Sequence, residues 1–343
     1  MAQARGILRH GLGALLLVFL WSGFGFVGLL QGTRADGAWL PPIRLSQSLA
    51  DSIQPAIAAT SDGHVHVVWE QDHVLYHTFR GTSGWSAPAR ITPGASATLA
   101  AGHDGYLHLA YLCEFEGFQR VFYCEWNGTQ WSCPTMVSAW GANAGEPRIA
   151  ADGAGRVAII WVSREAGAPP NTYSPLHYAT TESGLRSDLP LLAGGTLIKG
   201  RHPTLAYGPD GALYAAWEAR DAGEAAPEIC YAVQSEGQWS DGWFCVSYAA
   251  DVPCTQPDMA IDPGGRICLV WQEGAEGTGG PADVVFNSAD GGPGGRQALS
   301  SGANANAPRL SIDLRGGLHV AWSDGGKALR YRYAAAAGAA WQA

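Results

Sequence analysis

The chain has 343 residues, with 21 Lys or Arg against 30 Asp or Glu and a formal net charge of −9. This length is ample for one large hydrophobic core. Because an acidic chain repels the phosphate backbone, we do not expect a nucleic acid partner.

The first 35 residues differ from the rest of the chain. Arg5 and Arg9 precede an uncharged apolar run of 19 residues from Leu12 to Leu30, and Thr33-Arg34-Ala35 follows that run. A basic start, an apolar run and a small-x-small cleavage site are typical of an export signal. The run is also nearly long enough to span a bilayer. We therefore expect residues 1–35 to be a cleaved signal peptide or a membrane anchor through residues 12–30. In both cases the remainder is extracytoplasmic, either secreted or anchored.

Six ungapped sixteen-residue segments then repeat along the chain, each with Gly at its ninth position and an aromatic residue at its fifteenth. Successive segments begin 42 to 56 residues apart, a spacing typical of propeller blades. The segments are PAIAATSDGHVHVVWE (55–70), ATLAAGHDGYLHLAYL (97–112), PRIAADGAGRVAIIWV (147–162), PTLAYGPDGALYAAWE (203–218), PDMAIDPGGRICLVWQ (257–272) and PRLSIDLRGGLHVAWS (308–323).

Each segment predicts two strands joined by a tight turn, for which the Gly supplies the backbone freedom. The second strand is apolar on both faces, as expected of a strand buried between packed sheets, and its aromatic residue alternates in phase with core Val and Leu. A third strand with an aromatic residue and a short fourth strand follow, so about 50 residues make one four-stranded antiparallel blade. We therefore predict an all-β fold, a six-bladed β-propeller over residues 36–343.

The two ends of the propeller are predicted to complete one blade. Residues 39–46 (WLPPIRLS) align without gaps with residues 85–92 (WSAPARIT), a fourth strand, although no blade precedes them. After its third strand, the last repeat has only residues 334–343 left. We expect the N-terminal strand to close the ring in the sixth blade, which would remove the exposed sheet edges.

Seven cysteines in an exported chain allow disulfides. Cys124 and Cys133 flank one hairpin turn, Cys230 and Cys245 flank the corresponding turn of the fourth blade, and a cross-hairpin bridge can form at either place. Cys268 stands in a predicted core strand, so we expect a buried thiol there.

Neither a metal nor a cofactor is expected. The sequence has no Cys-x-x-Cys spacing. His66, His108 and His319 occupy one equivalent position in three blades, and such positions diverge around a ring instead of converging on an ion.

The connections from second to third strands are acidic. These 54 residues hold 13 of the 30 acidic residues and only four basic ones. Ligands of propellers bind over the central channel on this face, where carboxylates at the ends of rigid strands can bind a cation, an amine or sugar hydroxyls. The predicted ligand-binding residues are Glu70 and Glu273, which lie in these connections, with Trp140 and Trp243, which lie outside the repeat pattern and can stack on a sugar.

The fourth blade carries the most specific motif. Arg201-His202-Pro203 opens its first strand, Gly211 makes the turn, and Glu218-Ala219-Arg220 ends the second strand. Ser288-Ala289-Asp290-Gly291-Gly292 matches the first half of an Asp-box, with Gly295 where the Trp of the box would stand. These features resemble the sialidase (BNR/Asp-box-like) superfamily of six-bladed propellers, although that family has the Arg motif in its first blade.

The resemblance implies a catalytic set for the fourth blade. Arg201 would be one of three arginines that bind the carboxylate of sialic acid, Glu218 and Arg220 would stand beside it, and Asp221 would be the acid/base. A Tyr activated by a Glu would be the nucleophile. The sequence identifies no Tyr–Glu pair, and Arg148 and Arg309 lie one register away from the Arg motif.

Three functions remain open at this point. We expect an extracytoplasmic, non-catalytic module that binds a glycan or a cell-surface protein. The alternative is an exo-sialidase or related glycoside hydrolase acting at the fourth blade. The third is a surface module with a purely structural role.

Overall fold

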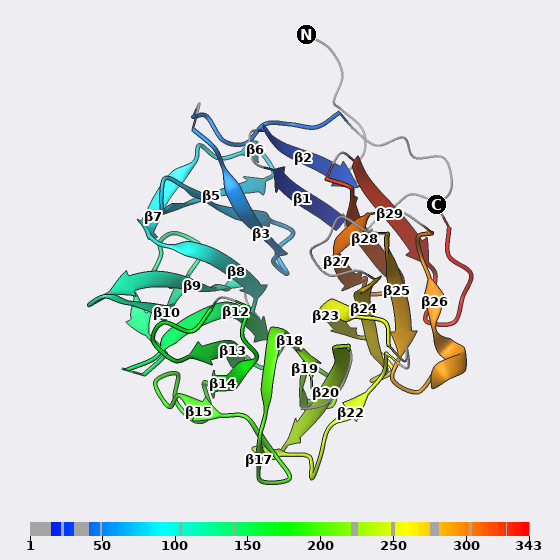
Figure 1. Ribbon diagram of the computed structural model, residues 1–343. Coiled ribbons are helices and arrows are strands. Elements are labelled where there is room, and N and C mark those ends of the chain that lie inside the picture. The colour runs from blue at the N-terminus through cyan, green and yellow to red at the C-terminus, as the bar shows by residue number, and fades with distance from the viewer. Residues whose placement is uncertain are drawn as a thin grey trace.

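The chain folds as an all-β propeller (Figure 1). The computed structural model describes the backbone of residues 15–21 and 24–30, and residues 41–48, 50–102, 105–139, 141–169, 171–220, 226–247, 251–274, 281–301, 304–326 and 328–342. Within these ranges a single short 3-10 turn, Pro293–Gly295, is helical.

Each sixteen-residue segment forms the predicted antiparallel pair of strands, with a glycine at φ between 80° and 84° in the turn of all six. In this conformation only glycine avoids steric strain. The pairs are β3 (Ile53–Ala59) with β4 (Val65–Gln71), β8 (Ala95–Ala101) with β9 (Leu107–Phe115), β12 (Asn143–Ala151) with β13 (Val157–Arg164), β18 (Lys199–Tyr207) with β19 (Leu213–Ala219), β23 (Cys254–Ile261) with β24 (Ile267–Gly274), and β27 (Ala305–Ile312) with β28 (Leu318–Asp324).

A third strand follows each pair and lies farther from the centre. These strands are β5 (Val74–Gly81), β10 (Phe118–Trp126), β14 (Ser174–Thr180), β20 (Glu228–Ser235), β25 (Ala282–Ser288) and β29 (Ala328–Ala334). Short outer strands add to them: β6 (Gly84–Trp85), β7 (Ala89–Pro93), β11 (Thr135–Met136), β15 (Leu189–Pro190), β21 (Gln238–Trp239), β22 (Phe244–Cys245) and β26 (Gln297–Ala298). The first strands of the pairs contact one another in chain order from β3 to β27, and Figure 1 shows them surrounding the centre.

Sheet pairing corrects the prediction of six four-stranded blades. The described residues form four sheets of four or more strands: β3–β7, β8–β11, β23–β26 and one of nine strands. The third and fourth repeats share the nine-stranded sheet because β14 also pairs with β18, through Ser174 with Gly200 and Pro175 with Lys199. The last repeat has only the three-stranded sheet of β27, β28 and β29.

The predicted closure of the ring by residues 39–46 is not confirmed. Leu45 is buried in a cluster with Val67 and Trp69 of the first repeat. At the last repeat, Gln342 pairs with Tyr333 of β29 through two backbone hydrogen bonds, so the C-terminal segment occupies that edge at this point.

The N-terminal apolar run contains two described strands, β1 (Leu15–Trp21) and β2 (Phe24–Leu30), which pair antiparallel. The expected cleavage site at Thr33-Arg34-Ala35 lies outside the described residues. No apolar helix of membrane-spanning length occurs in the part of the chain that the structure describes.

The core lies along the second strands, as their two-sided apolar pattern predicts. The aromatic residue at the fifteenth position is at most 4% exposed in every repeat: Trp69, Tyr111, Trp161, Trp217, Trp271 and Trp322. These side chains are therefore packing residues and are not accessible to a ligand.

A β-bulge interrupts the first strand of every pair. In the fourth repeat Arg201 pairs with Glu218 and Thr204 with Ala216, so three steps on β18 match two on β19. The other five repeats shift register at the equivalent place. The residue inside each bulge is not a glycine and has φ between 46° and 54°; these residues are Gln54, Ser96, Glu146, His202, Gln256 and Ala307.

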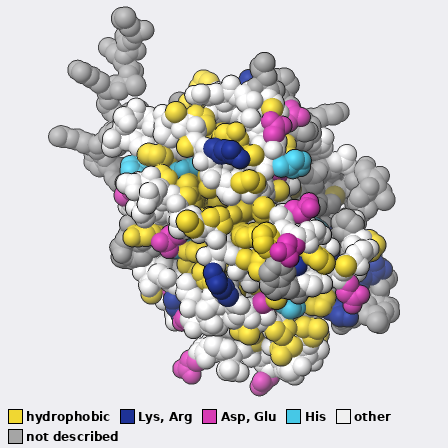
Figure 2. Space-filling view, turned by 90° about the vertical axis from the view of Figure 1, so that its left-hand side faces the viewer, with side chains coloured by type: hydrophobic (Ala, Val, Ile, Leu, Met, Phe, Trp, Pro, Cys, Tyr) yellow, Lys and Arg dark blue, Asp and Glu magenta, His cyan; other side chains and the backbone are white. Residues whose placement is uncertain are grey.

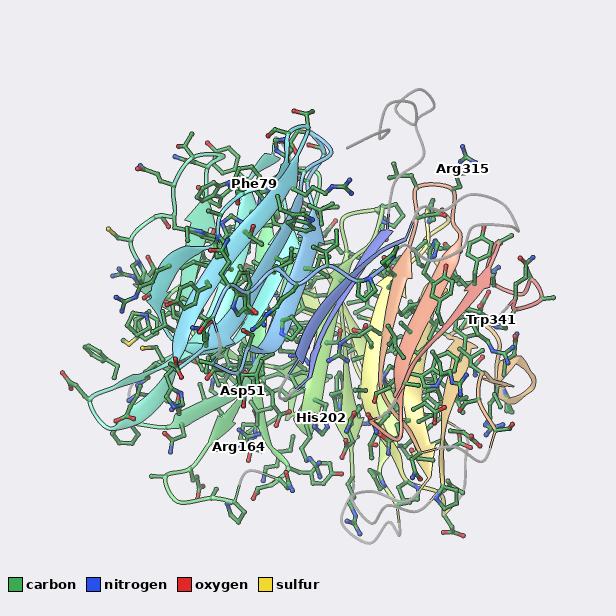
Figure 3. The ribbon with its side chains drawn as sticks, turned by 90° about the horizontal axis from the view of Figure 1, so that it is seen from above. Asp51, Phe79, Arg164, His202, Arg315 and Trp341 are labelled. Carbon is green, nitrogen blue, oxygen red and sulfur yellow. A yellow bond between two sulfur atoms is a disulfide. The ribbon has the colours of Figure 1, made fainter. Side chains whose placement is uncertain are left out.

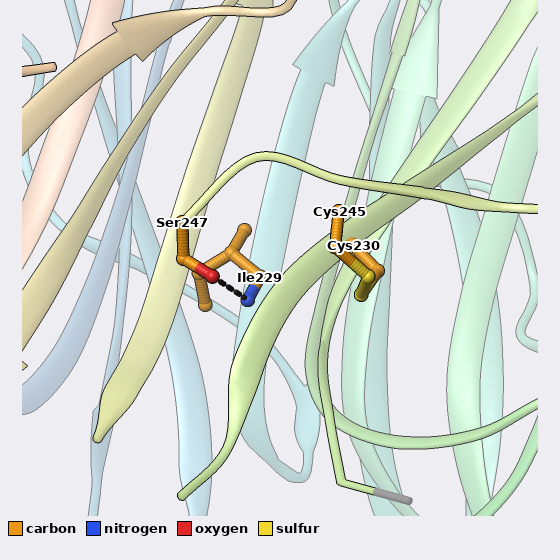
Figure 4. The surroundings of a disulfide bond; sticks show 4 residues. All are labelled: Ile229, Cys230, Cys245 and Ser247. Carbon is orange, nitrogen blue, oxygen red and sulfur yellow. Dashed lines mark hydrogen bonds between the residues drawn. A yellow bond between two sulfur atoms is a disulfide. The ribbon is translucent and has the colours of Figure 1, made fainter. Parts of the chain in front are cut away.

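Of the two disulfides considered, one forms. Cys230 on β20 is bonded to Cys245 on β22, its antiparallel partner, and next to this bond the backbone N–H of Ile229 donates to Ser247 Oγ at 3.2 Å (Figure 4). Cys124 and Cys133 are both free thiols, because Cys124 is buried beside Tyr111 while Cys133 is exposed. Cys268 is completely buried, as predicted.

Candidate functional site

The two carboxylates predicted to bind ligand already have partners. Glu70, at the end of β4, is 4% exposed, and its Oε1 lies 3.3 Å from Nδ1 of His73. Glu273, at the end of β24, forms a two-pronged ion pair with the guanidinium of Arg296. The acidic composition of these connections therefore does not translate into a set of unpaired carboxylates at Glu70 and Glu273.

The two tryptophans predicted to stack on a sugar differ in what the structure shows. Trp140 lies outside the described residues. Trp243 is half-buried and packs against the core cluster around β13, β14 and β19, so part of its ring surface is covered by the protein itself.

The outer side of the molecule shown in Figure 2 carries hydrophobic side chains over much of its surface, with charged side chains scattered singly.

The fourth blade, in contrast, brings several predicted residues together. Arg201 on β18 and Glu218 on β19 are register partners; Arg201 is 6% exposed and Glu218 is completely buried. Arg201 Nη1 lies 3.5 Å from Glu218 Oε1. Arg220 follows β19 and is exposed, and Asp221 lies outside the described residues.

Glu218 is the centre of a hydrogen-bonded cluster. The hydroxyl of Tyr173 donates to its Oε1, and Nδ1 of His202 lies 2.9 Å from its Oε2. Because a carboxylate accepts only, Nδ1 of His202 carries the proton. The guanidinium carbon of Arg201 lies 5.3 Å from the centroid of the Tyr173 ring. Tyr173 and Glu218 thus form a Tyr–Glu pair that the sequence did not identify.

Glu218 is ionised despite its burial. Burial by itself raises the pKa of this carboxyl. The hydrogen bonds from His202 and Tyr173, and then the charges of His202 and Arg201, outweigh burial and hold the pKa below its ordinary value of 4.5. At neutral pH Glu218 is therefore a negatively charged acceptor beside a phenol, an imidazole and a guanidinium.

A second carboxylate extends the cluster toward the third blade. Glu146, in the bulge of β12, accepts the backbone N–H of His202 through Oε2 at 2.5 Å, and its Oε1 pairs with Arg164 Nη2. Arg164 is the last residue of β13. We refer to Glu146, Arg164, Tyr173, Arg201, His202 and Glu218 as the Glu218 cluster.

The fold positions the cluster at one end of the propeller. Arg164, Tyr173 and Glu218 stand where second strands end or third strands begin, and Arg201 and His202 stand at the bulge beside them. Figure 3 shows Arg164 and His202 on the side opposite to Arg315, which lies in the turn from β27 to β28. Tyr173, His202 and Glu146 are half-buried, so the cluster has a buried charged base and partly accessible polar groups above it.

The other two arginines considered in the sequence, Arg148 and Arg309, lie on the inner strands β12 and β27. Burial and the nearby charge of Arg309 lower the pKa of Arg148 to about 10, although Asp258 and Glu146 act in the opposite direction. Arg148 on β12 therefore lies close enough to Arg309 on β27 for the charge of Arg309 to affect its pKa. Arg164 is the second arginine of the Glu218 cluster, and it comes from the end of a second strand instead of the Arg-x-Pro register.

The three equivalent histidines each bind a side chain of their own blade. Nδ1 of His66 lies 3.0 Å from Nε2 of His77, while His108 and His319 bond the hydroxyls of Tyr123 and Tyr331 at 2.8 and 2.7 Å. Among the described residues, one group of possible metal ligands lies close together: Glu228, Cys230 and Cys245. The sulfur atoms of its two cysteines are bonded to each other in the disulfide.

Comparisons with known proteins support the fold. No family model matches the sequence, and no curated protein matches it in sequence. A PL25 ulvan lyase bound to -[GlcA(1-4)Rha3S]- superposes with a TM-score of 0.59 at 13% identity, over 94% of this chain and 90% of the lyase. A GH93 α-L-arabinofuranosidase of Fusarium graminearum in complex with arabinobiose gives 0.54 at 13% identity, over 82% and 92%. The Aleuria aurantia lectin in complex with Fucα1-6GlcNAc gives 0.51 at 11% identity, over 85% and 94%.

At these identities the likeness concerns the fold alone. It supports a β-propeller and does not single out the sialidase superfamily. The structural neighbours include carbohydrate-active enzymes and a lectin.

Sequence reasoning found Arg201 and Glu218 but missed four members of the cluster as functional residues. Tyr173 stands in an irregular connection, where no periodicity marks it. Arg164 occupies the repeat position of Arg220, counted from the first residue of each segment, and this equivalence was the available signal. Glu146 and His202 precede the prolines Pro147 and Pro203, but nothing local shows that a bulge turns them toward each other.

Proposed function

We propose that this protein is an extracytoplasmic glycan-binding β-propeller whose ligand sits over the Glu218 cluster. The observation that carries the proposal is the buried, ionised Glu218 held by Tyr173, His202 and Arg201. A sugar is bound by an aromatic ring together with a few fixed donors and acceptors. The half-buried Tyr173 and His202 supply both, and buried partners fix their orientation.

Two features outside the site also support the proposal. The apolar segment within residues 1–35 supports export, as a signal or as an anchor. The Arg201-His202-Pro203 and Glu218-Ala219-Arg220 motifs support a distant relation to sialidase-type propellers.

Binding to a glycan panel tests the proposal, with variants that keep the fold. Tyr173→Phe removes the hydroxyl that donates to Glu218, and the loss of one hydrogen bond to a charged group corresponds to about tenfold weaker binding. Glu218→Gln removes the charge that orients three partners, and we expect a loss at least as large. Affinity for the best glycan is measured by isothermal titration calorimetry.

Glu70→Gln is the matched control. Glu70 is the last residue of the first segment, as Glu218 is of the fourth, and both side chains are buried. Among the described contacts, however, the Glu70 carboxylate bonds only His73. Its substitution should leave glycan affinity unchanged. Wild-type protein that binds nothing on a broad panel, or equal losses in Glu70→Gln and Tyr173→Phe, would overturn the proposal.

The Tyr–Glu pair favours a second candidate function, hydrolysis of a glycoside. In that reaction Glu218 takes the phenolic proton of Tyr173 as the Tyr173 oxygen bonds to the anomeric carbon and the glycosidic C–O bond breaks. The departing oxygen takes a proton from a separate acid; Asp221, the residue that the resemblance assigns to this role, lies outside the described residues. Water then bonds to the anomeric carbon and gives its proton back to the separate acid, while the bond from the anomeric carbon to the Tyr173 oxygen breaks and Glu218 returns the proton to Tyr173.

Fluorogenic glycosides distinguish the two functions. A hydrolase releases the fluorophore from a sialoside or an arabinofuranoside, and Tyr173→Phe abolishes release because no nucleophile remains. A binding module gives no turnover with either protein while its calorimetric affinity persists.

A further inference from the structure

The six bulges are joined in three pairs across neighbouring repeats. Gln54 Oε1 accepts the backbone N–H of Ser96 at 2.7 Å, Glu146 Oε2 accepts that of His202 at 2.5 Å, and Gln256 Oε1 accepts that of Ala307 at 3.1 Å. In each case both residues are the left-handed residues of their bulges. We call these three contacts the bulge clamps.

The clamp at the Glu218 cluster differs from the other two in its acceptor. Gln54 and Gln256 show that a neutral amide oxygen is sufficient for this bond. Glu146 has a carboxylate instead, and its second oxygen pairs with Arg164. The negative charge is therefore not needed by the clamp itself, and it has its partner in Arg164.

The backbone beside Glu146 is shaped to receive that arginine. A Cβ placed on Gly145 would stand 1.8 Å from Nη1 of Arg164, so the guanidinium lies directly on the glycine. Arg201 is the residue of the fourth repeat that corresponds to Gly145, since both stand two residues before the first residue of their segment. The guanidinium of Arg164 thus lies where the fourth repeat has the start of the Arg201 side chain, and each of the two cations lies beside a carboxylate.

His202 is held by one carboxylate at its backbone and by another at its ring. The backbone of His202 is fixed at one end by Glu146, and its ring is fixed at the other end by Glu218. We propose that Glu146 is a positioning residue: it clamps the left-handed backbone of His202 and so directs the imidazole to Glu218, while it holds Arg164 beside the site. Its effect on a ligand rests on the proposed glycan-binding function, whereas the clamp does not.

Two substitutions separate the two roles of Glu146. Glu146→Gln keeps an amide oxygen for the clamp, as at Gln54 and Gln256, but gives up the charge opposite Arg164. Glu146→Ala removes both. Gly145→Ala displaces the end of the Arg164 side chain without touching the clamp, and Gln54→Ala removes an equivalent clamp far from the cluster.

The first readouts need no ligand. Native-state hydrogen exchange of the His202 amide should be at least tenfold faster in Glu146→Ala and unchanged in Glu146→Gln, Gly145→Ala and Gln54→Ala. The ¹⁵N resonance of His202 Nδ1, which reports its bond to Glu218, should shift only in Glu146→Ala. In Gln54→Ala the Ser96 amide should exchange faster instead.

Glycan affinity is the second readout. We expect it to fall at least tenfold in Glu146→Ala, to fall by less in Glu146→Gln and Gly145→Ala, which disturb only Arg164, and to stay within threefold of wild type in Gln54→Ala. Slow His202 exchange in Glu146→Ala, or an equal loss of affinity in Glu146→Gln, would overturn the positioning role. If wild-type protein binds no glycan, the proposed function fails, and the exchange and ¹⁵N data still decide the clamp.

Discussion

Glu70 and Glu218 show how far identical sequence positions can differ in chemistry. Both end a second strand and both are buried. The side chains around them decide their use: Glu70 meets an exposed histidine, while Glu218 meets a phenol, an imidazole and a guanidinium from two repeats. A functional residue of a repeat protein is therefore defined by departures among its neighbours more than by its own identity.

The paired histidines of the first blade should make the protein sensitive to acid. Burial lowers the pKa of His66 to about 4 and that of His77 to about 3, with a further contribution from the charge of His66 at His77. In the unfolded chain both titrate near 6.5. As the pH falls below 6.5, the two histidines bind protons in the unfolded state but not yet in the folded state. The free energy of unfolding therefore decreases until the pH reaches the pKa values of the folded state.

Urea unfolding between pH 7 and pH 4.5 measures this loss. His66→Gln should flatten the pH dependence because one of the two groups no longer titrates. His73→Gln is the control, since that side chain is 94% exposed and should leave the slope as in wild type. A wild-type stability that does not change across this range would contradict the prediction. Glu218 acts in a lower window, since the stability from its depressed pKa is lost only as the pH falls below 4.5.

At the scale of the element, the hairpin turn is the part that local sequence specifies best. The ninth-position glycine adopts a left-handed conformation in all six repeats, as its recurrence at the same position of every segment predicts. The left-handed bulge residue, five residues before the end of each first strand, is equally regular, yet residues as different as Ser96, His202 and Ala307 occupy this position. The pairing of the two strands imposes their left-handed backbone, so the residue type at this position does not predict it.

Two glycines of one turn give a matched test of this conformational requirement. Gly155 has φ of +82° and Gly153 does not have a left-handed φ, while a Cβ on either would meet no atom within 4 Å. Gly155→Ala should lower the free energy of unfolding by about 1 to 2 kcal/mol, the cost of a left-handed non-glycine residue. Gly153→Ala should be neutral or slightly stabilising, because it restricts only the unfolded chain. Equal effects in thermal or urea unfolding would show that conformation is not the cause.

The sequence thus predicts the strand pairs, the turns and the buried aromatic residues, which depend on period and on local backbone freedom. It allows the Cys230–Cys245 bond, whose residues flank one turn, but it allows a Cys124–Cys133 bond on the same grounds, and only the first of these forms. It does not predict Tyr173, Arg164 or Glu146 as partners of the site. Their convergence depends on how the third and fourth repeats meet, and no pattern within either repeat contains that information.

At the scale of the whole molecule, pairing between repeats alters the picture of independent blades. The nine-stranded sheet joins the third and fourth repeats, and the Glu218 cluster spans this junction. The last repeat has three strands in its sheet, where Tyr333 pairs with Gln342. A repeat-by-repeat prediction could not anticipate the shared sheet, because it depends on pairing between the third and fourth repeats.

The single disulfide should influence the stability of the entire fold. Cys230 and Cys245 are 15 residues apart, and closing a loop of this length in the unfolded state is worth about 3 kcal/mol. Urea unfolding in the presence of a reductant should therefore show a lower midpoint, and Cys245→Ser should match the reduced wild type with or without reductant. Coincident oxidised and reduced curves would argue against this contribution.

The short hairpin of β16 (Leu192–Ala193) and β17 (Thr196–Leu197) separates the contributors to the cluster along the chain. Glu146, Arg164 and Tyr173 precede it, and Arg201, His202 and Glu218 follow it. Its exposed tip, Gly194-Gly195, is the kind of place where a chain tolerates a break. A cut there divides the six residues into two sets of three, so neither fragment alone has a Tyr173–Glu218 pair. Any binding or turnover at the cluster would then report that the two fragments have reassembled.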